Sequence, residues 1–211
     1  RQRQTPRIRR PNGGSGDNWL DYSGFTRTTG VTVDLTKGIA TSVGTGVGAA
    51  VTAVNNVRGS KFSDTLTGNS SPNILVGMAG NDTLRGMGGR DLLIGGIGAD
   101  VVDGGGATVK GGGGASGDLL IGGYTKFDTN NSALVGLLRE WNSSRDYITR
   151  VGNIVSGSGS TRLNGSNLLN STTVFDDFTP DTLFGGLGTD LDLFFVKLGD
   201  TWDKESAEFL L

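Results

Sequence analysis

Carboxylate and amide side chains recur every nine residues in the middle of the chain. From residue 59 to residue 103 the sequence divides into GSKFSDTLT, GNSSPNILV, GMAGNDTLR, GMGGRDLLI and GGIGADVVD, each with glycine first and Asp or Asn sixth. The sixth-position residues are Asp64, Asn73, Asp82, Asp91 and Asp100. Oxygen ligands of this kind suit calcium, which takes about six to eight of them in proteins. Zinc prefers nitrogen or sulfur, and the 211-residue chain has neither histidine nor cysteine.

Each block also has an aliphatic residue at position eight, in a run suited to a short β-strand. These residues are Leu66, Leu75, Leu84, Leu93 and Val102. Because strand side chains alternate between two faces, stacked blocks would align the eighth residues into an apolar core that no single repeat could bury alone. The glycine-rich residues before the strand form a tight turn whose carbonyl oxygens converge near the sixth side chain. The sequence therefore predicts an all-β fold in which strands supply the core and turns supply the ligands.

These blocks closely resemble the calcium-binding nonapeptide repeats of the RTX (repeat-in-toxin, haemolysin-type) family, with the pattern G-G-x-G-x-D-x-U-x, where U is a large aliphatic residue. The core of the resemblance covers residues 55–121. It implies a right-handed parallel β-roll, or β-solenoid, in which two nonapeptides make one coil and calcium lies between turns two repeats apart. It also implies export by the type I secretion route and folding outside the cell.

Candidate sites are therefore read in steps of eighteen residues. Asp82 with Asp100 is expected to form the best site and Asp100 with Asp118 the second. Asp64 with Asp82 is expected to be weaker, because Phe62 occupies the usual glycine at position four. The turn residues expected to take part are Gly77, Ala79, Gly80, Gly95, Gly96 and Gly98.

The opposite edge is expected to bind poorly. There Asp91 must pair with the neutral Asn73 or with Val109, which cannot bind an ion. Residues 104–112 keep the nine-residue phase but have Gly111 where the aliphatic residue is expected, so they are interpreted as one degraded turn of the roll. Asp190 ends a further glycine-rich turn and is an additional candidate. We expect one to three ions in the core, along one edge; the alternative is that the aspartates only cap turns.

The segments around the repeats follow other patterns. We divide the chain into an Arg-rich linker (1–12), N-terminal β-solenoid coils (13–54), the calcium-binding roll (55–121), a helical insert with a polar loop (122–175), and a C-terminal RTX-like turn and cap (176–211). Apolar residues of 133–141 share one helical face, and the insert is expected to pack over the roll and blunt its open edge. Glu208 to Leu211 are similar to the uncleaved secretion signals of RTX proteins.

Composition excludes several classes of function. Without cysteine or histidine there is no disulfide framework, Cys nucleophile or His-based triad. A net charge of −2 gives no broad basic surface for nucleic acid, and no apolar run is long enough for a transmembrane segment. The Arg-rich start is not a secretory signal peptide, and because the chain begins with Arg1 we expect a piece of a larger protein.

The predicted function is that of a structural module and not an enzyme. Stacked carboxylates repel one another and glycine is costly to order, so we expect the chain to fold when calcium binds. The module would be secreted or displayed on a bacterial cell surface, where it stabilises or presents a larger parent protein or surface matrix. One alternative is a glycan-binding adhesin or surface-layer module that uses exposed Trp19, Tyr124 or Trp141. Another is an accessory module of a polysaccharide lyase or epimerase.

Overall fold

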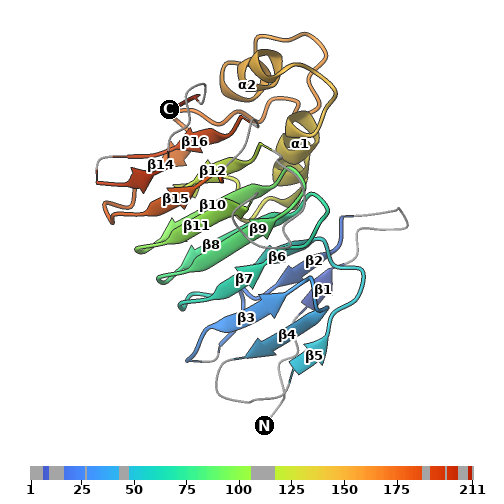
Figure 1. Ribbon diagram of the computed structural model, residues 1–211, viewed down its shortest axis with the longest axis vertical. Coiled ribbons are helices and arrows are strands. Elements are labelled where there is room, and N and C mark those ends of the chain that lie inside the picture. Colours follow the sequence, from blue (N-terminus) through green and yellow to red (C-terminus); the bar gives the residue numbers. More distant parts are fainter. Residues whose placement is uncertain are drawn as a thin grey trace.

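The computed structural model describes residues 7–9, 17–26, 28–42, 48–105, 117–186, 191–197, 199–203 and 209–210. Within them the chain is mostly β, with two eight-stranded sheets in two layers and two short helices at one side (Figure 1). Most of the Arg-rich linker and Asp190 lie outside the described residues. In sheet order, the strands of the first sheet are β1 (Arg7–Arg9), β2 (Trp19–Asp21), β6 (Asn56–Arg58), β8 (Ile74–Ala79), β10 (Leu92–Ile97), β12 (Leu119–Ile121), β16 (Leu193–Phe195) and β18 (Phe209–Leu210).

The second sheet alternates with the first along the chain. In sheet order, its strands are β17 (Thr201–Trp202), β15 (Thr182–Phe184), β11 (Val101–Gly105), β9 (Thr83–Met87), β7 (Thr65–Thr67), β3 (Val31–Asp34), β4 (Ile39–Ser42) and β5 (Gly48–Ala50). The remaining elements are β13 (Tyr124–Thr125), β14 (Val174–Phe175), α1 (Asn131–Trp141) and α2 (Tyr147–Val155).

Strands two repeats apart lie side by side and run parallel. Leu75 pairs with Val57 on one side and Leu93 on the other. In the second sheet Leu84 lies between Leu66 and Val102. Each nonapeptide therefore supplies one strand and crosses to the other sheet, which confirms the eighteen-residue step within this segment.

The eighth-position side chains meet between the two sheets. They form one apolar cluster and are fully buried or nearly so. The first sheet contributes Leu20, Val57, Leu75, Leu93, Leu120 and Phe194, and the second contributes Val33, Leu66, Leu84, Val102 and Leu183. Each buried leucine contributes about 1.5–3 kcal/mol relative to an exposed one, so the thin core depends on stacking successive repeats.

The two sheets differ on their outer faces. Strands β8, β10, β12 and β16 of the first sheet are apolar at three consecutive positions, as in Leu92–Leu93–Ile94, whereas strand β7 of the second sheet alternates, as Thr65–Leu66–Thr67. A strand that is apolar on both faces must be covered on both. Helices α1 and α2 provide the cover: Leu134, Trp141 and other helical residues pack in one cluster with the outward-facing side chains of the first sheet. The expectation that the insert packs over the roll is confirmed, although it lies on a sheet face.

The N-terminal segment extends both sheets but does not continue as regular coils. β2 pairs in parallel with β6 and β3 with β7. However, β4 is antiparallel to β3 and β5 is antiparallel to β4, while β1 is antiparallel to β2. The wider coils predicted for residues 13–54 are therefore partly replaced by antiparallel strands, because the turn at Thr36–Lys37–Gly38 reverses the chain within the same sheet.

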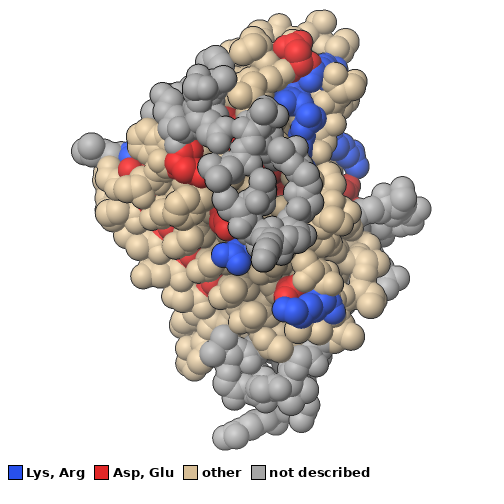
Figure 2. Space-filling view, viewed as in Figure 1, with Lys and Arg blue, Asp and Glu red and all other residues tan. Residues whose placement is uncertain are grey.

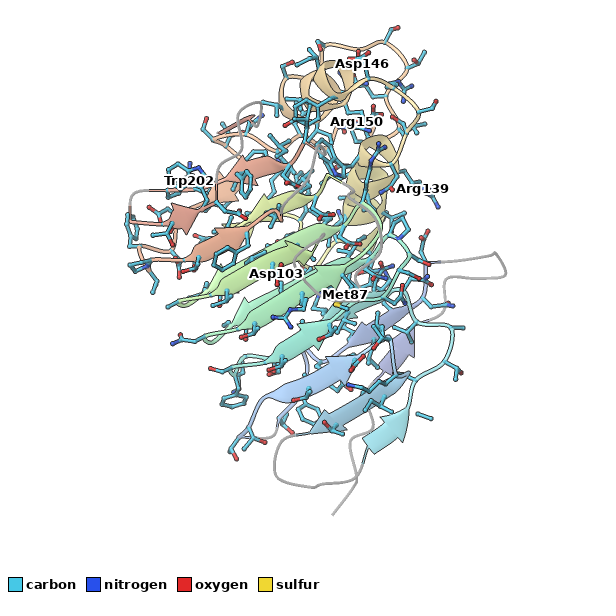
Figure 3. All side chains as sticks on the ribbon, in the orientation of Figure 1. Met87, Asp103, Arg139, Asp146, Arg150 and Trp202 are labelled. Carbon is cyan, nitrogen blue, oxygen red and sulfur yellow. The ribbon has the colours of Figure 1, made fainter. Side chains whose placement is uncertain are left out.

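Two methionines occupy backbone conformations that favour glycine. Met78 and Met87 are the second residues of their turns and have φ of 86° and 82°, while Gly96 and Gly105 hold the corresponding positions of later turns with φ of 117° and 103°. A bulky residue with positive φ is strained by about 1–2 kcal/mol. The side chain of Met87 is half-buried (Figure 3), and Met78 packs against the helix-covered cluster.

We expect Met87→Gly to raise the free energy of unfolding by about 1 kcal/mol, because the released strain exceeds the entropy cost of a new glycine. Denaturant unfolding in calcium buffer measures this change. Met78→Gly serves as the matched comparison and should gain less, since it also loses its apolar contacts. A destabilised Met87→Gly would contradict the strain argument.

Candidate metal-binding turns

The turns that lead from the first sheet to the second carry a ladder of aspartates, which we call the first edge. The main-chain N–H of Asp64 donates to Oδ1 of Asp82 over 2.7 Å, and the N–H of Asp82 donates to Oδ1 of Asp100 over the same distance. The N–H of Asp100 donates to Oδ1 of Asp181 over 2.8 Å, and Asp181 donates in turn to Asp200. One carboxylate oxygen of each aspartate after Asp64 is thus used to join consecutive turns.

The turns that lead from the second sheet back to the first form the second edge, with a ladder of the same kind. The N–H of Asn73 donates to Oδ1 of Asp91, and the N–H of Asp91 donates to Oδ1 of Asp118, both over 2.8 Å. The N–H of Asp118 donates to Oδ1 of Asp192. The second edge therefore presents three stacked aspartates after its asparagine.

This arrangement corrects the predicted pairing of Asp100 with Asp118. Asp118 follows Asp91 on the second edge, and Asp181 is the neighbour of Asp100. The reason is that β12 pairs directly with β10, and β11 pairs with β9 and β15, so no further strand lies between these neighbours. Val109 and Gly111 lie outside the described residues. The expectation that the repeats stay in phase across residues 104–112 was wrong, because Asp118 follows Asp91, 27 residues earlier, on the same edge.

The second carboxylate oxygen of three aspartates is buried and unpaired. Oδ2 of Asp82, Asp91 and Asp100 has no hydrogen-bond partner, and each residue is at most 1% exposed. On the face shown in Figure 2 the visible acidic side chains are scattered among other residues. An unpaired buried carboxylate oxygen is costly unless a cation or a donor meets it.

Backbone carbonyl oxygens converge beside these carboxylates. A Cβ atom added to Gly77 would lie 2.3 Å from Asp82 Oδ2 and 2.3 Å from the carbonyl oxygen of Gly95. On the second edge, a Cβ on Gly86 would lie 2.3 Å from Asp91 Oδ2 and 2.5 Å from the carbonyl oxygen of Gly104. Only glycine fits at the first position, and two negatively polarised oxygens face the space beside it. This donor set fits a hard cation such as calcium.

Burial holds the pKa values of several of the laddered aspartates above their usual range. Burial raises the pKa of Asp82 to about 7, and the nearby Asp64 carboxylate adds to the rise. Burial also raises the pKa of Asp100 to about 8, helped by the charges of Asp82 and Asp181. The pKa of Asp91 is raised well above its usual value by burial. Among the described residues, no three His, Cys, Asp or Glu side chains cluster closely enough to hold a metal by themselves, so backbone oxygens must complete any site.

Asp64 and Asn73 are poorer candidates than the other sixth-position residues. Both oxygens of Asp64 accept hydrogen bonds, Oδ1 from the N–H of Val31 and Oδ2 from the N–H of Ser60. Oδ1 of Asn73 accepts from the N–H of Asn69, and its amide nitrogen donates to the carbonyl of Asn55. Because these side-chain oxygens already accept hydrogen bonds, they need a cation less than the unpaired oxygens of Asp82, Asp91 and Asp100 do.

The predicted turn residues lie together as expected from the repeat. Gly77 and Ala79 lie in the last part of β8 and Gly80 follows it before Asp82, while Gly95 and Gly96 lie in the last part of β10 and Gly98 follows it before Asp100. A Cβ on Gly98 would lie 2.1 Å from the carbonyl oxygen of Gly80, so the two turns stack closely.

Sequence reasoning missed Asp181, Asp192 and Asp200. Each is followed after one residue by a large apolar side chain that enters or borders the core: Leu183, Phe194 and Trp202. This Asp-x-apolar spacing is the end of the nonapeptide, and it would have found all three without the glycines that normally precede it. The glycine-rich turn before Asp190 made that residue the predicted candidate. Asp192, which is 2% exposed, holds the ladder position instead.

The aromatic residues suggested for glycan binding are not exposed as expected. Trp19 and Trp141 are at most 1% exposed, because both pack between the helices and the first sheet. Tyr124 is half-buried and stacks on Phe175 with ring centres 5.2 Å apart. No stacking platform for a sugar is formed by these three residues.

Comparison with known proteins identifies the repeats. Residues 52–84 and 76–107 match the model of the RTX calcium-binding nonapeptide repeat, and a search of curated proteins found no match. In the described part of the chain no helix has the length and apolar character needed to cross a membrane. RTX nonapeptide repeats bind calcium, and the matched residues include the turns in which Asp82, Asp91 and Asp100 have buried, unpaired oxygens. Residues 52–107 are therefore a segment of RTX calcium-binding nonapeptide repeats.

Proposed function

We propose that the protein is a calcium-binding β-roll module that folds on binding calcium and stabilises or presents a larger extracellular or cell-surface protein. One observation carries the proposal: Oδ2 of Asp82, Asp91 and Asp100 is buried and unpaired beside a carbonyl oxygen of the next turn. The two sheets, joined by these turns, would then form a right-handed parallel roll. Bound calcium would balance the negative charge of the stacked carboxylates.

Ions are expected between consecutive turns of both edges. On the first edge Asp82 and Asp100 would hold an ion together with turn carbonyls such as that of Gly95. On the second edge Asp91 and Asp118 would do the same with the carbonyl of Gly104. This replaces the one-edge arrangement expected from the sequence, because the second edge has the same unpaired oxygen as the first.

Coupling between binding and folding follows from the cost of ordering these turns without a cation. Without a cation, charged carboxylates would be buried next to one another, and the glycines of each turn would lose much backbone entropy on ordering. A bound ion offsets both terms only in the folded state, so binding free energy becomes folding free energy. Proteins with RTX repeats are typically secreted by the type I route, and the high calcium outside the cell would then trigger folding.

Circular dichroism with and without calcium, together with calorimetric counting of bound ions, tests this proposal. We expect β-structure in calcium, its loss in chelator, and no equivalent rescue by magnesium, which keeps its water ligands more firmly. A chain that is equally folded in chelator and takes up no calcium would show that the proposal is wrong.

A further inference from the structure

One turn of the first edge is split by the helical insert. Gly122 follows β12 and Asp181 precedes β15, with residues 123–180 and both helices between them. The two ends nevertheless meet as in a continuous turn: a Cβ on Gly122 would lie 2.6 Å from Asp181 Oδ2. The N–H of Thr182 also donates to the carbonyl of Asp100 over 2.9 Å, which sets β15 beside β11.

The split turn places oxygen atoms at the same positions as the unbroken turns do. A Cβ on Gly95 would lie 2.4 Å from the carbonyl oxygen of Gly122 and 2.6 Å from Asp100 Oδ2. Around Gly77, one repeat pair earlier, the corresponding oxygens come from Gly95 and Asp82. Asp100 Oδ2 is buried and has no hydrogen-bond partner, so a carboxylate oxygen and a carbonyl oxygen face the same space, which suits a cation.

The insert adds negative charge close to this position. The N–H of Gly98 donates to Oδ2 of Asp177 over 2.6 Å, which ties the returning end of the insert to the turn that ends at Asp100. Besides burial, the negative charges of Asp177 and Asp181 raise the pKa of Asp100, and those of Asp176 and Asp200 raise the pKa of Asp181. The charged groups that shift the pKa values of Asp100 and Asp181 are all acidic, so the local field favours a divalent cation.

The two ends of the insert pair with each other directly next to the split turn. β13 and β14 pair as a short antiparallel ladder, which we call the neck, and the N–H of Lys126 donates to the carbonyl of Thr173 over 3.0 Å. The N–H of Gly96 donates to the carbonyl of Gly122 over 3.1 Å. The carbonyl oxygen just before the neck, that of Gly122, is therefore one of the two oxygens that face the space beside Asp100.

We propose that a calcium ion bound between Asp100 and the split turn of Gly122 and Asp181 fastens the neck of the helical insert to the repeats. This inference rests on the proposed calcium-binding function and extends it to a site that combines Asp100 of the matched repeat segment with residues outside that segment. Calcium then does more than stack the repeats: it closes the base of the insert whose helices cover the first sheet. Loss of this ion loosens the neck while the apolar contacts of α1 still hold the helices in place.

Asp181→Asn tests the proposal in the full chain, because asparagine keeps an oxygen that can accept from the N–H of Asp100 but loses the negative charge. Asp64→Asn is the matched control on the same edge, far from the neck. Calorimetry counts the ions, and hydrogen exchange at the amide of Lys126 reports the neck. We expect Asp181→Asn to bind about one ion fewer and to speed this exchange about tenfold, with no change at Lys126 in Asp64→Asn.

The possible failures are distinguishable. If the wild-type chain takes up no calcium, the proposed function itself is wrong. If the wild type binds calcium and Asp181→Asn binds the same number of ions, the split turn holds none. If an ion is lost but exchange at Lys126 stays at its wild-type rate, the ion does not fasten the neck.

Discussion

Asp91→Ala is expected to reduce calcium uptake as strongly as Asp100→Ala. Each substitution removes a buried, unpaired Oδ2 from the middle of a ladder, and each also removes the Oδ1 that accepts from the preceding turn, at Asn73 or at Asp82. In calcium buffer each variant should lose about 3 kcal/mol of stability, the linkage contribution of one ion at about one hundred times its Kd. Calorimetric titration and denaturant unfolding measure the two effects.

Asp103→Ala is the control for this comparison. Asp103 lies on the outer face of the second sheet, where its carboxylate pairs with Arg85 over 3.1 Å (Figure 3). Because partly exposed ion pairs contribute little, this variant should keep its calcium uptake and almost all its stability. If Asp91→Ala behaved like Asp103→Ala while Asp100→Ala lost its ions, binding would be confined to the first edge.

Without calcium, the folded state is expected to become more stable as the pH falls from 8 to 4. The pKa values of Asp82, Asp100 and Asp181 are raised by burial to about 7, 8 and 7, above the usual value of 3.8. The folded chain therefore binds protons that the unfolded chain releases, so their stabilising effect is complete below about pH 4 and is lost as the pH rises through 7 to 8. Each such carboxylate changes the free energy of unfolding by up to a few kcal/mol.

With calcium the dependence is expected to reverse. Protons compete with the ion for the same oxygens, so calcium affinity should fall as the pH drops below about 7. Circular dichroism in chelator, where the β-content should be low at pH 8 and rise toward pH 4, gives the first curve, and calorimetric calcium affinity over the same pH range gives the second. Two curves with the same slope would show that these carboxylates are not the groups that exchange protons for calcium.

The regular part of the fold could be predicted from the sequence because its signals are local and repeated. Glycine, Asp and Leu recur in phase, so the positions of Leu75, Leu84 and Leu93 in one core and the neighbours Asp82 and Asp100 follow from the spacing alone. The parallel pairing of strands two repeats apart also follows from the repeat length, since nine residues suffice for one turn and one strand.

The irregular part could not be predicted because insertions preserve spatial neighbours but not sequence spacing. Asp118 lies on the second edge because β12 pairs directly with β10, and Asp181 lies on the first edge although the whole helical insert precedes it in the chain. A turn needs only its ends to meet, so any length of chain can intervene between Gly122 and Asp181. The antiparallel β4 and β5 also have apolar spacing that does not distinguish them from parallel strands.

A crystal structure of the calcium-loaded protein, with anomalous scattering recorded for calcium, tests the central claim most directly. We expect anomalous peaks between consecutive turns on both edges, including one beside Asp82 and Asp100 and one beside Asp91 and Asp118. Peaks on one edge alone would contradict the two-edge arrangement. Well-ordered turns without any peak would contradict calcium binding by these aspartates.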